Sequence, residues 1–108
     1  MTGGSRGTVK SRIHRGRLAL RDLLVTTSGA AARISGVILY DETLRQTASN
    51  GAPFTSLLRD VGMIPGIKVD TGAKPLAFAS GETVTEGLDG LRERLSEYRS
   101  LGARFAKW

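Results

Sequence analysis

The chain has 108 residues and a formal net charge of +6, and 40% of its residues are hydrophobic and 24% charged, which is ordinary for one globular domain. It contains no Cys, which excludes disulfides, thiolate metal sites and cysteine nucleophiles and fits a reducing, cytoplasmic setting. No run approaches the roughly 18 apolar residues of a membrane span, and the N-terminal residues lack the apolar centre of a secretory signal, so we expect no membrane segment.

The positive charge is concentrated near the N-terminus. Residues 1–21 hold six Lys and Arg and no acid, whereas residues 22–108 hold the other ten (16 − 6) and all ten Asp and Glu. Residues 1–16 are rich in Gly, Ser and Arg, and we expect a flexible basic arm there, ahead of a domain at residues 17–108. A phosphate-binding tail is the alternative. Because the arm lacks β-branched runs, it is not expected to supply a strand.

From residue 17 onward the pattern becomes regular. "RLALRDLLVTT" (17–27) spaces its leucines as a short amphipathic helix does, and "GVILY" (36–40) is typical of a buried strand. A helix is predicted to begin at Pro53 and to end near Gly62, followed by a strand in "IPGIKVD" (64–70) and a loop over residues 71–85. Residues 86–102 predict the clearest helix, and "ARFAKW" (103–108) predicts a third strand.

Strands that alternate with helices indicate successive right-handed βαβ units and a parallel sheet. The fold class is therefore α/β, with about three parallel strands and helices between them. The spacing suits a small doubly wound domain or part of a (β/α)8 TIM barrel, and periodicity does not separate these two.

Charged residues stand at the ends of two predicted strands. Lys68 and Asp70 are two residues apart, so they point to the same side of an extended chain, and Lys107 ends the next strand. In α/β folds, functional groups gather where parallel strands end. Two lysines at one such edge suit a phosphorylated or carboxylated substrate, or supply an amine, with Asp70 orienting Lys68 or accepting a hydroxyl hydrogen bond. Exposed strand-end charges are the simpler alternative.

Other polar groups carry less information. Asp41 and Glu42 follow the first predicted strand, where a helix start or loop role is favoured over an active-site role. The segment "RERLSEY" (92–98) is interpreted as a solvated helix face. No His, Asp and Glu cluster has the spacing of metal ligands, so no metal site is predicted.

Four segments together resemble class I fructose-bisphosphate aldolase, the metal-independent family that acts through a Schiff base. They are "SGVILYDETL" (35–44), "GIKVDTG" (66–72), "GETVTEGLDGL" (81–91) and "ARFAKW" (103–108), in the order and spacing of the family. The similarity runs from Arg17 to Trp108. It implies the second to fourth strands of a (β/α)8 barrel. It also implies reversible cleavage of fructose 1,6-bisphosphate to dihydroxyacetone phosphate and glyceraldehyde 3-phosphate, a reaction of glycolysis and gluconeogenesis.

The resemblance also implies roles for single residues. Lys107 is similar to the family's catalytic lysine beside the Schiff-base site, where it also contacts substrate. Lys68 is similar to a second lysine near the substrate hydroxyls, with Asp70 beside it. Arg17 resembles a substrate-binding arginine, although Leu18 and Leu20 depart from the family's pattern. No cofactor is implied, and a homotetramer is implied only for a complete family member.

Three parts of the family's site have no counterpart among these residues. They are the first-strand segment with its catalytic Asp, the catalytic Glu and the Schiff-base Lys. A barrel of this type takes roughly 250 residues. The chain alone is therefore expected to be inactive. It is also expected to be marginally stable, aggregation-prone or dependent on a partner, because an open sheet exposes unpaired backbone groups. A basic nucleic-acid-binding module and a non-catalytic remnant are the alternatives; the neutral body does not favour nucleic acid.

Overall fold

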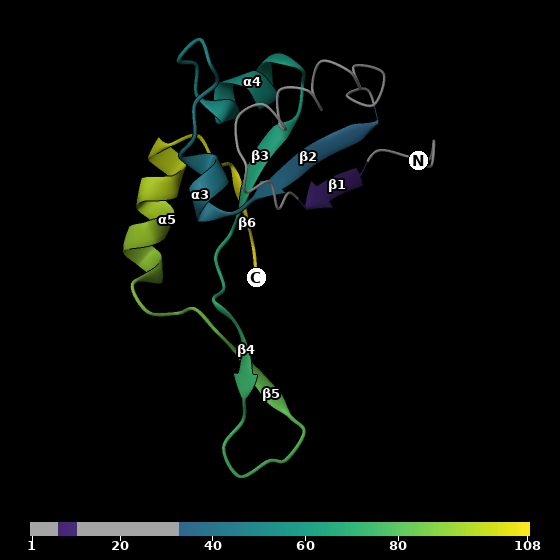
Figure 1. Ribbon diagram of the computed structural model, residues 1–108, viewed down its shortest axis with the longest axis vertical. Coiled ribbons are helices and arrows are strands. Elements are labelled where there is room, and N and C mark those ends of the chain that lie inside the picture. The colour runs from purple at the N-terminus through teal and green to yellow at the C-terminus, as the bar shows by residue number, and fades with distance from the viewer. Residues whose placement is uncertain (1–6, 11–32) are drawn as a thin grey trace.

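The computed structural model describes residues 7–10 and 33–108 (Figure 1). The helix predicted over residues 17–27, and Arg17 with it, lie outside the described residues. The described elements are four strands of one sheet, a separate two-stranded hairpin and three helices.

The main sheet consists of strands β1 (Gly7–Lys10), β2 (Ile34–Leu39), β3 (Ile64–Lys68) and β6 (Phe105–Lys107), in that spatial order. All three neighbouring pairs are parallel, which confirms the predicted α/β class. β2, β3 and β6 are the three predicted strands. Their connections run through the helices, as parallel strands require.

Strand β1 was not predicted, and the expectation that the basic arm would supply no strand is wrong. Gly7–Lys10 pairs with β2, so that Val9 lies opposite Val37. Parallel pairing is made by backbone N–H and C=O groups, which every residue except proline carries. The strand at residues 7–10 is therefore stabilised by pairing with β2, and the side-chain propensities of these residues did not predict it. The proposed boundary between an arm and a domain at residue 16 stays a prediction.

The helices begin and end near turn-forming residues. α4 (Phe54–Asp60) begins one residue after the predicted start, because Pro53 is extended and occupies the N-cap. Gly62 with φ +85° follows the end of α4, as predicted. A short helix, α3 (Asp41–Leu44), begins directly after β2 at Asp41. α5 (Leu91–Ser100) is shorter than the helix predicted over residues 86–102. Leu88, which lies inside the predicted range, precedes the helix and is 73% exposed.

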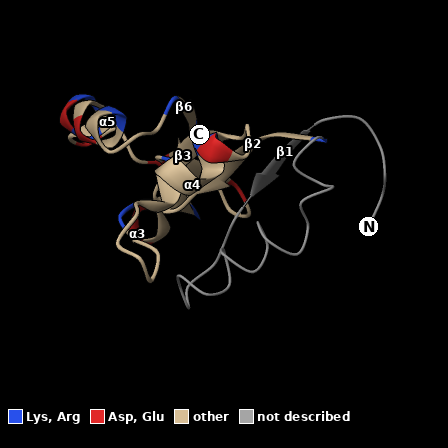
Figure 2. Cartoon of the chain, turned by 90° about the horizontal axis from the view of Figure 1, so that it is seen from above, with Lys and Arg blue, Asp and Glu red and all other residues tan. Residues whose placement is uncertain are grey.

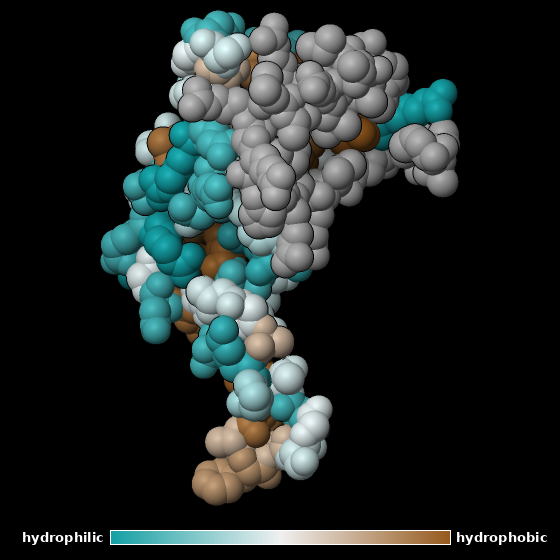
Figure 3. Space-filling view, in the orientation of Figure 1, coloured by the Kyte–Doolittle hydropathy of each residue, from teal (hydrophilic) through white to brown (hydrophobic). Residues whose placement is uncertain are grey.

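The segment predicted as a loop over residues 71–85 contains a β-hairpin. β4 (Gly72–Pro75) and β5 (Thr83–Glu86) pair antiparallel and project away from the sheet (Figure 1). Hydrophobic side chains gather at the hairpin's tip, at the bottom of Figure 3, where Phe78 is fully exposed. Its Gly, Ser and Thr content suggested a loop, but local backbone pairing orders it into strands.

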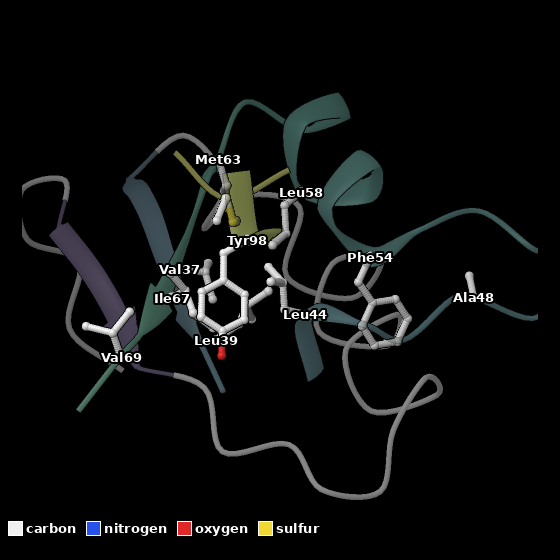
Figure 4. Packing of buried hydrophobic residues seen from close by; sticks show 11 residues of the cluster. Val37, Leu39, Leu44, Ala48, Phe54, Leu58, Met63, Ile67, Val69 and Tyr98 are labelled. Atoms are coloured by element: carbon white, nitrogen blue, oxygen red, sulfur yellow. The ribbon is translucent and has the colours of Figure 1, made fainter. Parts of the chain in front are cut away.

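The hydrophobic core lies between the sheet and the helices. Alternate residues of β2 and β3 point into it, and α4 and α5 cover them, with the Tyr98 ring among Val37, Leu39 and Ile67 (Figure 4). The buried members are Val37, Leu39, Leu44, Ala48, Phe54, Leu58, Met63, Ile67, Val69, Tyr98 and Ala103. The intervening strand residues, among them Gly66 and Lys68, therefore face the other side of the sheet.

On that opposite face, the Phe105 ring of β6 lies across Gly66 of the adjacent strand β3 and reaches Gly36 of β2. A Cβ on Gly66 would lie 2.3 Å from the Phe105 Cζ atom, and one on Gly36 would lie 3.1 Å from its Cε1. Gly66→Ala is therefore expected to lower the free energy of unfolding by about 1–3 kcal/mol, because the ring must leave its place. Urea unfolding measures the loss. Adding Phe105→Leu to Gly66→Ala should restore part of it; an unchanged midpoint for Gly66→Ala would contradict this packing.

Candidate active-site edge

The central feature of the site is an ion pair at the carboxyl end of β3. Lys68 Nζ lies 2.6 Å from Asp70 Oδ1, and the Gly72 backbone N–H donates to the same oxygen at 3.0 Å. The Lys68 side chain is 18% exposed and that of Asp70 only 6%. The two-residue spacing predicted that these side chains share a side, and the structure brings them into contact.

The pair keeps Asp70 ionised at neutral pH. The hydrogen bond from Lys68 lowers the pKa of the Asp70 carboxyl below its ordinary value; desolvation opposes the shift, and the charge of Lys68, the Gly72 N–H and the charge of Lys107 add to it. The second carboxylate oxygen, Oδ2, is buried and has no hydrogen-bond partner in the described part of the chain. A buried, ionised oxygen of this kind has an acceptor position that the described residues do not fill.

Lys107 lies beside Lys68 on the neighbouring strand. The β3–β6 register sets Lys68 opposite Lys107, and the Val69 N–H donates to the Lys107 carbonyl at 3.0 Å. Directly opposed residues of neighbouring strands point to the same face, so both ammonium groups lie on the face away from the helices. The two strand ends therefore supply two cations and one carboxylate to one edge of the sheet.

A cavity of about 670 Å³ opens between the end of β3, the base of the hairpin and α5. Lys68, Asp70, Tyr40, Arg94 and Tyr98 are among the residues that line it. Lys68 Nζ lies 5.8 Å from the centroid of the Tyr40 ring, within the range of a cation–π contact. Lys107 does not line this cavity.

Arg94 is a residue of this edge that sequence analysis misjudged. It belongs to "RERLSEY", interpreted as a solvated face, but its guanidinium reaches across to the end of β3 and donates to the Val69 carbonyl at 3.0 Å. Arg92 and Glu93 are exposed, as that interpretation predicted. Helical periodicity indicates which face a residue lies on, and it carries no signal for a long side chain that bonds backbone carbonyls.

A second polar cluster connects α3 to α5. Arg45 forms ion pairs at 3.0 Å with both Asp41 and Glu97, and the Tyr98 hydroxyl donates to Asp41 Oδ1 at 2.8 Å. The hydrogen bond from Arg45 is the main cause that lowers the pKa of Asp41. Asp41 and Glu42 occupy the first turn of α3, where negative charge favours a helix. The partners of Asp41 are therefore structural ones, Arg45 and Tyr98. Helix α5 carries charges of both signs (Figure 2).

The described residues contain neither a metal-binding cluster nor a membrane-spanning helix. Within residues 7–10 and 33–108, no group of three or more His, Asp and Glu lies close enough to hold a metal ion. No helix in the same part of the chain is both long and apolar enough to cross a membrane.

The sequence profile of the glycolytic family "Fructose-bisphosphate aldolase class-I" matches residues 10–108. A protein of Xanthomonas campestris pv. campestris, named probable fructose-bisphosphate aldolase class 1, is 62% identical over 92 residues, which are 85% of this chain and 28% of that protein. Cytosolic fructose-bisphosphate aldolase 6 of Arabidopsis thaliana is 56% identical over 92 residues, 85% of this chain and 26% of that protein.

A solved structure of fructose-bisphosphate aldolase from Plasmodium falciparum, in complex with TRAP and a small-molecule inhibitor, is similar with a TM-score of 0.75 and 50% identity. The match covers 83% of this chain and 26% of that one. The parallel sheet with its helices is thus part of a (β/α)8 barrel, as the resemblance predicted. The chain spans 28% and 26% of the lengths of the two curated relatives above. With a family profile over residues 10–108 and relatives more than half identical, the chain belongs to the class I fructose-bisphosphate aldolase family.

Proposed function

We propose that this chain provides part of the substrate site of a class I fructose-bisphosphate aldolase. The reaction is the reversible cleavage of fructose 1,6-bisphosphate to dihydroxyacetone phosphate and glyceraldehyde 3-phosphate. The observation that carries the proposal is the juxtaposition at one sheet edge of Lys68, Lys107 and the buried, ionised Asp70. Two cations and a hydrogen-bond acceptor match a ligand that carries both phosphate and hydroxyl groups.

In the Schiff-base mechanism, a lysine amine attacks the substrate ketone, water leaves, and a protonated imine forms. That imine accepts the electron pair released when the carbon–carbon bond breaks. Lys107 contacts the substrate beside the imine, and its positive charge stabilises negative charge that develops there. Lys68 holds substrate oxygens, and Asp70 orients Lys68 through their ion pair. Arg17, outside the described residues, is a further substrate-binding candidate.

The imine-forming lysine is assigned to neither Lys68 nor Lys107, so these 108 residues alone are proposed to be inactive. The chemistry needs no metal, because the protonated imine serves as the electron sink. The cytosolic relatives support a cytoplasmic location.

The assignment is tested by adding dihydroxyacetone phosphate and borohydride to the chain and measuring its intact mass. Borohydride reduces an imine to a stable amine adduct. No stoichiometric adduct is expected at Lys68 or Lys107; a stoichiometric adduct mapped to either residue would overturn their assignment as auxiliary lysines.

Binding is measured by NMR titration of the same ligand into the full chain. Lys68→Met and Lys107→Met should each weaken binding. Lys74→Met, which removes an exposed hairpin lysine, is the matched control and should leave binding unchanged. Equal binding by all three variants would contradict the proposal.

A further inference from the structure

Arg94 bonds three backbone carbonyls, which lie on two segments next to the Lys68–Asp70 pair. Its Nη1 donates to the Val69 carbonyl at 3.0 Å, and its Nη2 donates to the Gly87 carbonyl. Nε and Nη2 both donate to the Asp89 carbonyl, at 3.3 and 3.2 Å. A planar guanidinium offers five donors in a fixed fork, so one side chain holds carbonyls from the end of β3 and from the loop that leads into α5.

Two of these carbonyls, those of Val69 and Gly87, belong to residues that adjoin Asp70. Val69 separates Lys68 from Asp70 in the chain, and Gly87 packs against the Asp70 backbone: a Cβ on Gly87 would lie 2.7 Å from Asp70 Cα. The Thr71 N–H donates to the Glu86 carbonyl at 2.8 Å, which continues the contact between the two segments. The course of the backbone on both sides of Asp70 is therefore fixed by hydrogen bonds that converge on Arg94 and on the hairpin base.

The hydrogen bonds of Arg94 indicate a specific task. Four of its hydrogen bonds end on carbonyl oxygens, and its guanidinium also interacts with the Tyr98 hydroxyl. Its side chain also lines the cavity into which Lys68 and Asp70 face. By contrast, Arg45 pairs with the exposed carboxylates of Asp41 and Glu97. These ion pairs connect α3 to α5 and do not involve the end of β3.

We propose that Arg94 is a positioning residue: it fixes the backbone at Val69 and Gly87 and thereby holds Asp70 in the place where it orients Lys68. Lysine cannot replace it, because one ammonium does not span carbonyls that lie on different segments. The effect on ligand binding rests on the proposed function of Lys68 and Asp70, whereas the effect on the geometry of Asp70 does not.

The first test follows the Asp70 side-chain carboxyl by ¹³C NMR as a function of pH, in the full chain. Lys68 and Lys107 are the charged groups that act on this carboxyl. Arg94→Gln and Arg94→Lys are both expected to raise the Asp70 midpoint toward the ordinary value of about 3.9. Arg92→Gln, an exposed arginine of the same helix, is the matched control and should leave the midpoint unchanged. An unchanged midpoint in folded Arg94→Gln would overturn the proposal.

A measurement that leaves Arg94 in place covers the case in which Arg94 variants do not fold. The Arg94 Nε–H signal should shift when Asp70 titrates and when Asp70→Asn is introduced, while the Arg92 signal stays in place. An Arg94 signal that ignores Asp70 in both experiments would overturn the proposal without any change to Arg94.

The final test separates this proposal from the proposed function. Arg94→Gln should weaken binding of dihydroxyacetone phosphate by about tenfold, since small displacements of binding groups have effects of this size or larger. If the unsubstituted chain does not bind the ligand while the Asp70 midpoint still depends on Arg94, the proposed function fails and the positioning role stands. If the ligand binds and Arg94→Gln binds equally well, the positioning role fails alone.

Discussion

Phe54→Ala is expected to lower the free energy of unfolding by about 3–5 kcal/mol, the typical loss for a fully buried phenylalanine. Phe54 is 0% exposed and is the first residue of α4, where it packs within the same core as Leu44 and Leu58 (Figure 4). Removing the ring deletes apolar contact area and leaves a cavity that the sheet and helix only partly close. The whole free energy of unfolding of a small domain is about 5–15 kcal/mol, so this loss is a large share of it.

The loss is measured by urea unfolding followed by circular dichroism. Arg59→Ala is the matched control, because it removes a long exposed side chain from the same helix and should change the free energy of unfolding by no more than about 0.5 kcal/mol. Similar losses for Phe54→Ala and Arg59→Ala would contradict the packing of α4 onto the sheet.

The strands and helices that build the core could be predicted from sequence because their patterns report burial directly. β2 contains the apolar run "GVIL" (36–39), and the Phe54 and Leu58 spacing marks the inner face of α4. The elements that were missed owe their structure to neighbours or to local backbone pairing. β1 has a Gly-rich, basic context and is a strand beside β2, and the β4–β5 hairpin consists almost wholly of exposed residues.

The candidate site likewise has some features that sequence patterns predict and others that depend on neighbouring segments. Strand periodicity of two predicted that Lys68 and Asp70 share a side, and the order of parallel strands predicted Lys107 nearby. The backbone contacts of Arg94 and the burial of Asp70 Oδ2 depend on how the hairpin returns to the sheet. Because the hairpin itself was not predicted, sequence analysis had no means of placing these groups.

Asp70→Asn is expected to lower the free energy of unfolding at pH 7 by about 1–3 kcal/mol, the typical cost of depriving a buried polar group of its partner. The amide keeps the size of the carboxylate but removes the charge that pairs with Lys68 Nζ at 2.6 Å. The folded state lowers the pKa of Asp70, so its contribution is fully present above the unfolded pKa of about 3.9. That contribution is lost as the pH falls through the lower, folded-state pKa. The difference in free energy of unfolding between the unsubstituted chain and Asp70→Asn should therefore be constant from pH 5 to 7 and disappear in stronger acid.

A double-mutant cycle assigns this effect to the pair rather than to Asp70 alone. Urea unfolding of Lys68→Met, Asp70→Asn and the double variant at pH 7 gives the coupling energy. If the ion pair is the source, the double variant should be less destabilised than the sum of the single variants, because it leaves neither a buried charge nor a missing partner. Asp60→Asn, at the exposed end of α4, controls for loss of a carboxylate and should change the free energy by less than about 0.5 kcal/mol. Strict additivity at pH 7 would show that Lys68 and Asp70 do not act as one unit. The assignment of Asp70 as the group that orients Lys68 would then be wrong.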